Sequence, residues 1–357
     1  MDFSLSDDQR LLCDSLNRVL DDLVTVDLIR THAKGEADES VWQALIELGV
    51  PGLAISQSCG GSGLGMLEAA LVAECLGRHA APTPFIASCV IAPLALGRYA
   101  SEEQKQHWLP RLAEGEITFG LAISELTGGR EAAGVHRDAA GLNGRSLFVI
   151  DSAADFYLVG SSDARLYIVD GEAVGLSHQQ LVTVDTTRHF GELEFNNVEA
   201  IEITNANAES LSTLIDVARV MTAADTLGAA QHMQDAAVAY AKEREQFGRV
   251  IGSFQAVKHM CAEMVAALEP CRSMLWYAAY ALDEIHDESH LYACHCKAHL
   301  SEVGTGVAKT ATEVHGGVGF TDLLGLHYWF KRIGVNRQLL GSPERARLDA
   351  ARAQGLA

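Results

Sequence analysis

The chain has 357 residues, enough for two or three domains, and its formal net charge of −20 excludes non-specific attraction to nucleic acid or to an anionic membrane. Hydrophobic residues make up 48% and charged residues 21%, no apolar run is as long as a membrane span, and the start MDFSLSDDQR lacks a signal-peptide pattern. The eight cysteines are spread over a long chain and several lie in apolar stretches, so we expect a reduced, cytoplasmic protein without a membrane span.

In chain order, the predicted elements are helical, then β, then helical. Residues 1–115 show amphipathic stripes that begin after candidate N-caps such as Ser6 and Ser101, and predict an N-terminal helical domain. Residues 116–205 contain short apolar or alternating runs bounded by Gly, Asp and Ser, and predict a small, mostly antiparallel β domain, for which the family resemblance given below implies a barrel-like form. Residues 206–357 predict a C-terminal antiparallel four-helix bundle, the last helix spanning about 323–355. The expected fold is mainly α with a central β domain.

One stretch interrupts the bundle pattern, EREQFGRVIGSFQAVKH at residues 243–259. Glycines stop a helix there, and Arg244, Gln246, Phe247, Phe254 and Gln255 crowd around the break. Arginine suits a diphosphate, and aromatic rings beside amide side chains suit a purine and a ribose. Chemistry alone leaves two interpretations open, a ligand site and an ordinary corner between helices.

Two glycine-rich strings have local explanations. GGSGLG at residues 60–65 lacks the GxSxG spacing of a hydrolase elbow and lies in no βαβ unit, so a turn is the simpler interpretation. HGGVGF at residues 315–320 suits either a helix C-cap or close approach of backbone N–H groups to a phosphate.

The segment HLYACHCKAH, residues 290–299, contains histidines and cysteines that could bind a metal. His290 with Cys294, and His295 with His299, are pairs one helical turn apart. The two pairs point in different directions and no CxxC spacing is present, so a polar face beside buried cysteines is favoured and no metal is expected.

The order of these motifs resembles the acyl-CoA dehydrogenase family. The resemblance is carried by RxQFGxxIGxFQxxxH at 244–259, GGxGF at 316–320, ELGVPGLAISQSCGGSGLG, ALVAECLGRHAAPTPF, EEQKQHWLPRLAEGE and FGLAISE, along nearly the whole chain. It implies the three-domain fold given above, with FAD held between subunits. It also implies an acyl-CoA substrate that loses an α-proton to a carboxylate base and a β-hydride to the flavin, which then passes its electrons to an electron-transfer acceptor.

The resemblance implies unequal roles along the chain. Arg244, Gln246, Phe247, Phe254 and Gln255 match the segment that holds the diphosphate and adenosine of a neighbouring subunit's FAD. A matched glycine pair, Gly316 and Gly317, lets backbone approach the same FAD, and Glu313 stands where the family has a glutamine.

The flavin-side motifs are less complete. Ser124 keeps a hydroxyl in the family's TEPxxGSD position, but Arg130 replaces the second serine. Phe148 occupies the tryptophan position of GxKxWIT, and Ile150 occupies the threonine position, so that side chain cannot hydrogen-bond a flavin.

Both family positions for the base lack a carboxylate. They are Leu340, in LLGSPE, and Ala218, just before Arg219 on the first bundle helix. An aliphatic side chain cannot take up a proton, so the cleft of this chain is expected to be inert. Glu344 and Asp225 are the remaining candidates for a displaced base.

The resemblance therefore implies a small subunit of a heteromeric, FAD-dependent acyl-CoA dehydrogenase, in an α2β2 assembly with a non-identical catalytic partner. The VDTTRHFGELEF string and the short middle domain resemble the branch that acts on bulky acyl-CoAs, including steroid side-chain thioesters. Two alternatives remain, a self-sufficient homo-oligomer with a relocated base and a structural partner that binds no FAD.

Overall fold

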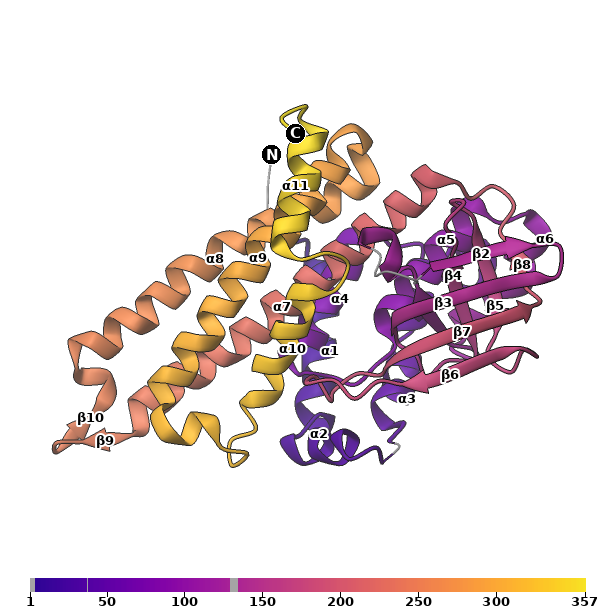
Figure 1. Ribbon diagram of the computed structural model, residues 1–357. Helices are drawn as coiled ribbons and strands as arrows, with labels where there is room; N and C mark the ends of the chain where they lie inside the picture. Colours follow the sequence, from indigo (N-terminus) through magenta and orange to yellow (C-terminus); the bar gives the residue numbers. More distant parts are fainter. Residues whose placement is uncertain (1–3, 37, 129–133) are drawn as a thin grey trace.

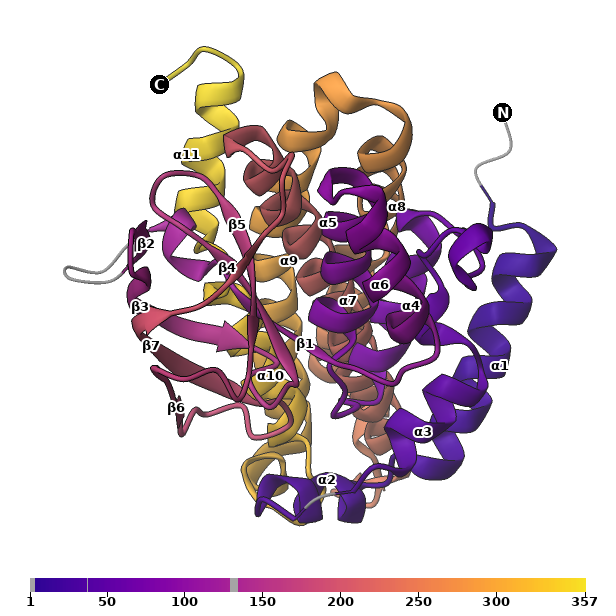
Figure 2. The same cartoon turned by 90° about the vertical axis from the view of Figure 1, so that its right-hand side faces the viewer.

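The computed structural model describes residues 4–36, 38–128 and 134–357. It has a helical N-terminal region, a β-sheet and a bundle of long helices, in that order along the chain (Figure 1). Seen from the side, the sheet and the N-terminal helices α1, α3 and α4 lie on different sides of the bundle (Figure 2). The predicted fold class, mainly α with a central β region, is confirmed.

The N-terminal helices begin where the sequence places capping residues. Ser6 and Ser101 each accept a hydrogen bond from the backbone of the third helical residue, and a glutamine side chain completes each capping box. The helices are α1 (Asp7–Leu23), α2 (Val26–Ala33), α3 (Ser40–Glu47), α4 (Met66–Arg78), α5 (Ala92–Tyr99) and α6 (Glu102–Ala113), with the π-helical turn η3 (Phe85–Ile91) before α5.

Strands β1 to β8 form one open sheet, and the described residues of the middle region close no barrel. Its order is β6-β7-β3-β1-β4-β5-β8, with β2 paired to β3, and all described pairings are antiparallel except β1 with β4. The strands are β1 (Phe119–Ala122), β2 (Gly134–Asp138), β3 (Gly141–Ile150), β4 (Phe156–Gly160), β5 (Leu166–Asp170), β6 (Leu176–Gln180), β7 (Phe190–Val198) and β8 (Ile201–Glu202), and the 3-10 turn η4 (Ser124–Thr127) follows β1.

The bundle is built around α7 (Ala208–Glu243), which is buried along most of its length and packs against α9 (His286–His315) and α4. A short hairpin of β9 (Glu245–Gln246) and β10 (Arg249–Val250) joins α7 to α8 (Gln255–Glu284) at the end of the bundle farthest from the sheet (Figure 1). After η6 (Gly316–Phe320), the chain returns through α10 (His327–Gln338) and α11 (Pro343–Ala353).

The expected single last helix is wrong, because it breaks between α10 and α11. Leu340 and Gly341 both have positive φ, at 57° and 100°, which an α-helix does not allow. Ser342 then caps α11 by accepting a hydrogen bond from the Arg345 backbone, and Pro343 occupies its first turn. This break places Leu340 beside the sheet.

Candidate functional site

A cleft of about 720 Å³ lies between the β3 side of the sheet and the break between α10 and α11. Aliphatic side chains and Phe148 form most of its wall, and Val182 and Val184 are exposed at its rim. The lining residues are Ser124, Glu125, Thr127, Gly128, Leu147, Phe148, Val182, Thr183, Val184, Gly334, Val335, Gln338, Leu339, Leu340, Gly341, Ser342 and Arg345.

Neither family position for the base offers a carboxylate to this cleft. Leu340 lines the cleft, is 2% exposed, and its carbonyl oxygen accepts a hydrogen bond from Arg219 Nε at 3.0 Å. Its positive φ is unusual for a leucine, so the turn is held by its surroundings. Ala218 is fully buried inside α7 and is not part of the cleft wall.

The two displaced carboxylates are engaged elsewhere. Glu344 is on the surface and pairs with Arg337 at 3.2 Å. Hydrogen bonding to Ser342 lowers the pKa of Glu344 most, and the charge of Arg337 lowers it further. Asp225 is 3% exposed and accepts hydrogen bonds from Arg332, with an Nη2–Oδ2 distance of 2.6 Å. Neither carboxylate lines the cleft, so the structure gives no support to either as a base.

Glu125 is the one carboxylate among the described residues of the cleft wall, and sequence reasoning assigned it no role. It accepts hydrogen bonds from the Ser146 hydroxyl at 2.8 Å and from the Leu147 backbone N–H. These bonds tie η4 to β3, so Glu125 serves as a structural anchor there.

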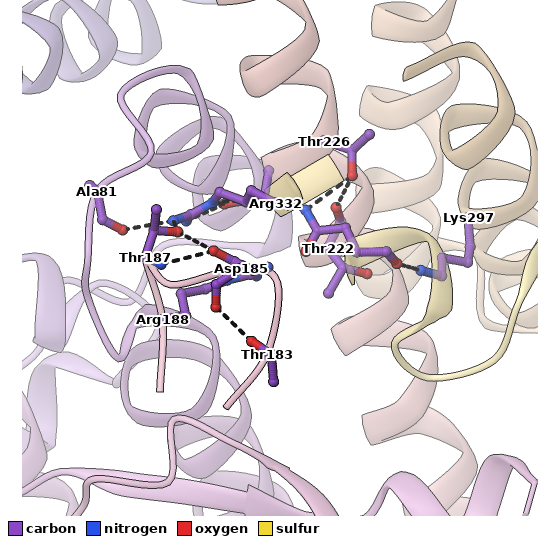
Figure 3. Close-up of polar contacts among 11 residues, drawn as sticks. Ala81, Thr183, Asp185, Thr187, Arg188, Thr222, Thr226, Lys297 and Arg332 are labelled. Carbon is purple, nitrogen blue, oxygen red and sulfur yellow. Dashed lines mark hydrogen bonds and ion pairs between the residues drawn. The ribbon is translucent and has the colours of Figure 1, made fainter. Parts of the chain in front are cut away.

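A buried polar network centred on Arg332 lies in the interior of the chain (Figure 3). Arg332 binds Asp225 and also donates to Ala81 O at 3.1 Å and to Thr187 Oγ1 at 2.9 Å. Asn336 donates to Asp225 Oδ1 at 2.6 Å. The network therefore joins α7 and α10 to the chain after α4 and to the chain before β7.

Only a cavity of about 10 Å³, room for a single water, remains beside Ile150. Asp151, Arg188, Asp225 and Arg332 form its charged wall. Burial raises the pKa of Asp151 to about 7, although Arg188 and Arg332 lie near enough to oppose the shift. In the described part of the chain, these charged groups are therefore closely packed beside Ile150.

The flavin-side residues make contacts within the chain. The Ser124 hydroxyl donates to the Phe148 carbonyl oxygen at 2.9 Å, and Phe148 itself has a positive φ of 55°. Ile150 is 1% exposed and offers no polar side-chain atom. Arg130, the replacement of the family's second serine, lies outside the described residues.

A second hollow of about 360 Å³ adjoins the cleft and is lined by His290, one of the residues considered above as metal ligands. The Asp216 carboxylate lies beside His290 and Cys294, and the possible ligand atoms of the three residues are within 4.8 Å of one another. A hydrogen bond to Asp216 raises the pKa of His290 to about 10. Arg219, however, places a guanidinium 3.2 Å from the Cys294 sulfur and 3.6 Å from Asp216 Oδ1. This cation takes the place a metal would need, so we propose no metal here.

The β9–β10 hairpin presents the other candidate residues to solvent. Phe247 and Gly248 both have positive φ, 55° and 74°, which makes the two-residue loop a type I′ turn. Phe247 is 91% exposed and its ring meets that of Phe254 edge-on at 6.2 Å. Arg244 and Gln246 are exposed beside it, so the hairpin gathers a cation, an amide and two aromatic rings.

The predicted glycine pair lies at the end of α9, in the turn η6. Gly316 has φ 63° and ψ −144°, a conformation that suits glycine, whereas Gly317 has no such constraint. A Cβ on Gly317 would meet nothing within 4 Å, so packing inside the chain does not explain this glycine. Glu313 and Gln255 are also exposed.

The two halves of the candidate site are far apart in this chain. The hairpin lies at the end of the bundle farthest from the sheet, whereas the cleft lies where the α10–α11 break meets the sheet (Figure 1). One small molecule held by the hairpin therefore cannot also reach the cleft of the same chain.

This arrangement defines a flavoenzyme-type fold, and comparison with known proteins identifies the family. Residues 6–116 match the acyl-CoA dehydrogenase N-terminal domain and residues 209–355 match the acyl-CoA dehydrogenase C-terminal domain. The chain belongs to the acyl-CoA dehydrogenase family, as the motifs suggested, and the cofactor of this family is FAD.

Several relatives have similar length. The chain is 28% identical over 307 residues to acyl-CoA dehydrogenase IpdE2 of Mycobacterium tuberculosis, covering 86% of this chain and 84% of the relative. Among solved structures, the ChsE4-ChsE5 complex from Mycobacterium tuberculosis has a TM-score of 0.92 at 27% identity and full coverage of both chains. A variant of the Tcur3481-Tcur3483 steroid ACAD has a TM-score of 0.89 at 29% identity, covering 99% of each chain.

The described residues fit one part of FAD and not the other. The hairpin and the space beside Gly317 suit a diphosphate and an adenine, because they offer a cation, the exposed Phe247 ring and room for a ligand to approach the backbone. The cleft suits the flavin ring poorly, since Ile150 cannot donate to it and the Ser124 hydroxyl is used inside the chain. No helix of the described residues is long and apolar enough to cross a membrane.

Proposed function

We propose that this chain is the non-catalytic subunit of a heteromeric, FAD-dependent acyl-CoA dehydrogenase. Its hairpin would grip the adenosine diphosphate part of an FAD whose flavin ring lies in a partner subunit. When bound, FAD accepts hydride from the β-carbon of the acyl-CoA. In this proposal, the chain binds and orients the cofactor through Arg244, Gln246, Phe247, Phe254 and Gln255.

The observation that carries the proposal is the contrast between a cleft without a base and an exposed hairpin that keeps its cation, amide and aromatic side chains. Removal of an α-proton needs a base within hydrogen-bond reach, and Leu340 and Ala218 cannot serve. A self-sufficient enzyme would require such a base in its own cleft.

The strain in the hairpin supports a role for Phe247 outside this chain. A non-glycine residue in the left-handed region costs about 1–2 kcal/mol, and asparagine is tolerated better than phenylalanine there. An exposed aromatic side chain recovers little of that cost by packing, because Phe247 contacts only the edge of Phe254. The residue is explained if its ring packs on the adenine or on the partner.

The assembly and substrate are proposed from relatives. ChsE4-ChsE5 and Tcur3481-Tcur3483 are named as pairs of chains, the second as a steroid ACAD. We propose an α2β2 assembly for this chain and its partner, acting on a bulky acyl-CoA such as a steroid side-chain thioester. The exposed Val182 and Val184 at the cleft rim are compatible with an apolar neighbour there.

Co-expression with the partner tests the proposal. We expect the isolated 38.3 kDa chain to be colourless, and the complex to carry about one FAD per pair of chains by absorbance, at an α2β2 mass by native mass spectrometry. Reduction of an artificial electron acceptor by an acyl-CoA should require the partner. Full flavin content and turnover in the isolated chain would contradict the proposal.

Arg244→Ala separates cofactor binding from a purely structural role. Loss of a charge-assisted contact to the diphosphate should weaken FAD retention about 10- to 100-fold in the assembled complex. Arg18→Ala, on the exposed face of α1, is the matched control and should leave flavin content unchanged. If Arg244→Ala also leaves it unchanged, the chain holds no FAD through this residue.

A further inference from the structure

The β9–β10 hairpin carries a second arginine, Arg249, at a position that the motif RxQFGxxIGxFQ leaves open. The backbone register of the hairpin pairs Arg249 with Gln246. Arg249 is exposed, as is Arg244 at the start of the hairpin. The hairpin therefore offers two guanidinium groups to solvent, and only Arg244 has been given a role above.

The two arginines lie on the same face of the hairpin. Directly opposed residues of an antiparallel pair project their side chains to one face, and so do residues two apart along a strand. Gln246 and Arg249 therefore share a face. Arg244 has extended backbone, with φ −69° and ψ 126°, and its carbonyl oxygen accepts from the Ile251 N–H at 2.7 Å, so the ladder continues and Arg244 joins that face. Glu245, the one carboxylate between residues 244 and 251, projects to the opposite face.

Phe254 holds the Arg249 side chain in position. The guanidinium carbon of Arg249 lies 4.0 Å from the centroid of the Phe254 ring, the distance of a guanidinium stacked on an aromatic face. Phe254 is half-buried at the start of α8, so its ring is itself anchored to the bundle. An arginine oriented in this way loses less conformational freedom on binding a ligand than one that moves freely in solvent.

The same contact limits what the Phe254 ring can bind. Arg249 covers one face of this ring, and Phe247 meets it edge-on at an interplanar angle of 80°. Phe247 is 91% exposed and offers the open aromatic surface. Phe254 is thus placed to orient Arg249, whereas Phe247 is the ring that remains open to an adenine.

The charges of both arginines are unused within the chain. Among the residues that the structure describes, no carboxylate forms an ion pair with Arg244 or Arg249, and neither guanidinium donates a hydrogen bond. Exposed arginines elsewhere do form such pairs, as Arg165 does with Glu202 at 3.1 Å. In a chain of net charge −20, two neighbouring cations on one face favour an anion from outside the chain.

We propose that Arg249 is a second phosphate-binding cation, which acts with Arg244 on the diphosphate of the FAD and is positioned by Phe254. This inference rests on the proposed function. A diphosphate carries two negative charges and has acceptor oxygens on both phosphates, so a pair of guanidinium groups on one face matches it in charge and in hydrogen bonding. Adenosine carries no such charge, so Arg249 should add affinity only for ligands that contain the diphosphate.

The test uses the assembled complex of this chain and its partner. FAD is removed, its rebinding is followed by flavin fluorescence, and ADP and adenosine are each titrated as competitors. Arg249→Ala should weaken binding of FAD and of ADP about 10-fold or more, reduce the salt dependence of ADP binding, and leave adenosine binding unchanged. Arg347→Ala, an exposed arginine of α11 away from the hairpin, is the matched control and should alter none of the three affinities (Figure 1).

A double-mutant cycle tests the positioning role of Phe254. Phe254→Leu should weaken FAD binding about 2- to 5-fold in the parent complex, because the stacked guanidinium loses its support. In the Arg249→Ala background the same substitution should have no measurable effect on FAD binding. Equal effects in both backgrounds would show that Phe254 contacts the ligand itself and would overturn its positioning role.

The outcomes separate this inference from the proposed function. If Arg244→Ala weakens FAD binding but Arg249→Ala changes neither FAD nor ADP affinity, the inference is wrong and the proposed function stands. A complex that carries no FAD, or that binds FAD equally well after both substitutions, would contradict both. If Arg249→Ala dissociates the complex without lowering FAD affinity in the pairs that remain, Arg249 contacts the partner protein instead, and the inference is again refuted.

Discussion

Substituting Phe247 by asparagine should stabilise the isolated chain but weaken FAD binding by the complex. Phe247 is the first central residue of a type I′ turn and Gly248 is the second. Asn-Gly is the preferred pair for this turn, because asparagine tolerates positive φ. The side chain is 91% exposed, so its removal opens no cavity.

The magnitude follows from these observations. Relief of the left-handed strain contributes about 0.5–1 kcal/mol of stability to the hairpin. The lost edge contact with Phe254 costs at most about 0.5–1 kcal/mol, and less at an exposed pair. The free energy of unfolding of the isolated chain should therefore change by about 0 to +1 kcal/mol. Loss of the aromatic face that stacks on the adenine should weaken FAD binding by about 1–3 kcal/mol.

Urea unfolding of the isolated chain and the flavin-to-protein absorbance ratio of the dialysed complex measure the two effects. We expect equal or higher stability together with roughly 5- to 150-fold weaker flavin retention. Leu11→Ala, another exposed apolar side chain far from the hairpin, should leave the flavin ratio unaltered. A clear loss of stability, or an unaltered flavin ratio in Phe247→Asn, would refute the reasoning.

Two further outcomes are expected. Burial raises the pKa of Asp151 to about 7, so the stability that its protonated carboxyl contributes is fully present below the unfolded pKa near 4 and is lost as pH rises toward 7. Asp151→Asn should therefore remove about 2–3 kcal/mol of the decrease in the free energy of unfolding between pH 5 and pH 8. If urea unfolding gives the parent and the variant the same pH dependence, this reasoning is wrong. Leu340→Glu should give no acyl-CoA dehydrogenation in the isolated chain, because the proposed role leaves the flavin ring in the partner subunit. Leu340→Gln is the control for folding, and turnover that appears only with glutamate would contradict that role.

The sequence predicted the order of regions and the helix break within residues 243–259, because both depend on local patterns. Caps such as Ser6 and Ser101 lie within four residues of the groups they satisfy, and the QFG string encodes its own turn. The break between α10 and α11 was missed although LLGSP carries glycine and proline, since the helical pattern on both sides was read as one helix.

The buried network was missed for a different reason. Asp225 and Arg332 are more than one hundred residues apart, and each alone resembles an ordinary polar position on a helix. Asp225 was therefore considered as a displaced base, whereas the fold pairs it with Arg332 and Asn336.

The same network explains how a chain with an unsuitable cleft could remain useful to a partner. A buried ion pair stabilises a fold only when its remaining donors and acceptors are satisfied. Arg332 meets that condition by reaching α7, the chain after α4 and the chain before β7 at once. These hydrogen bonds join the three regions in the interior. A rigid joint there would hold α7, and with it the hairpin at its end, in a fixed position for binding a cofactor outside the chain.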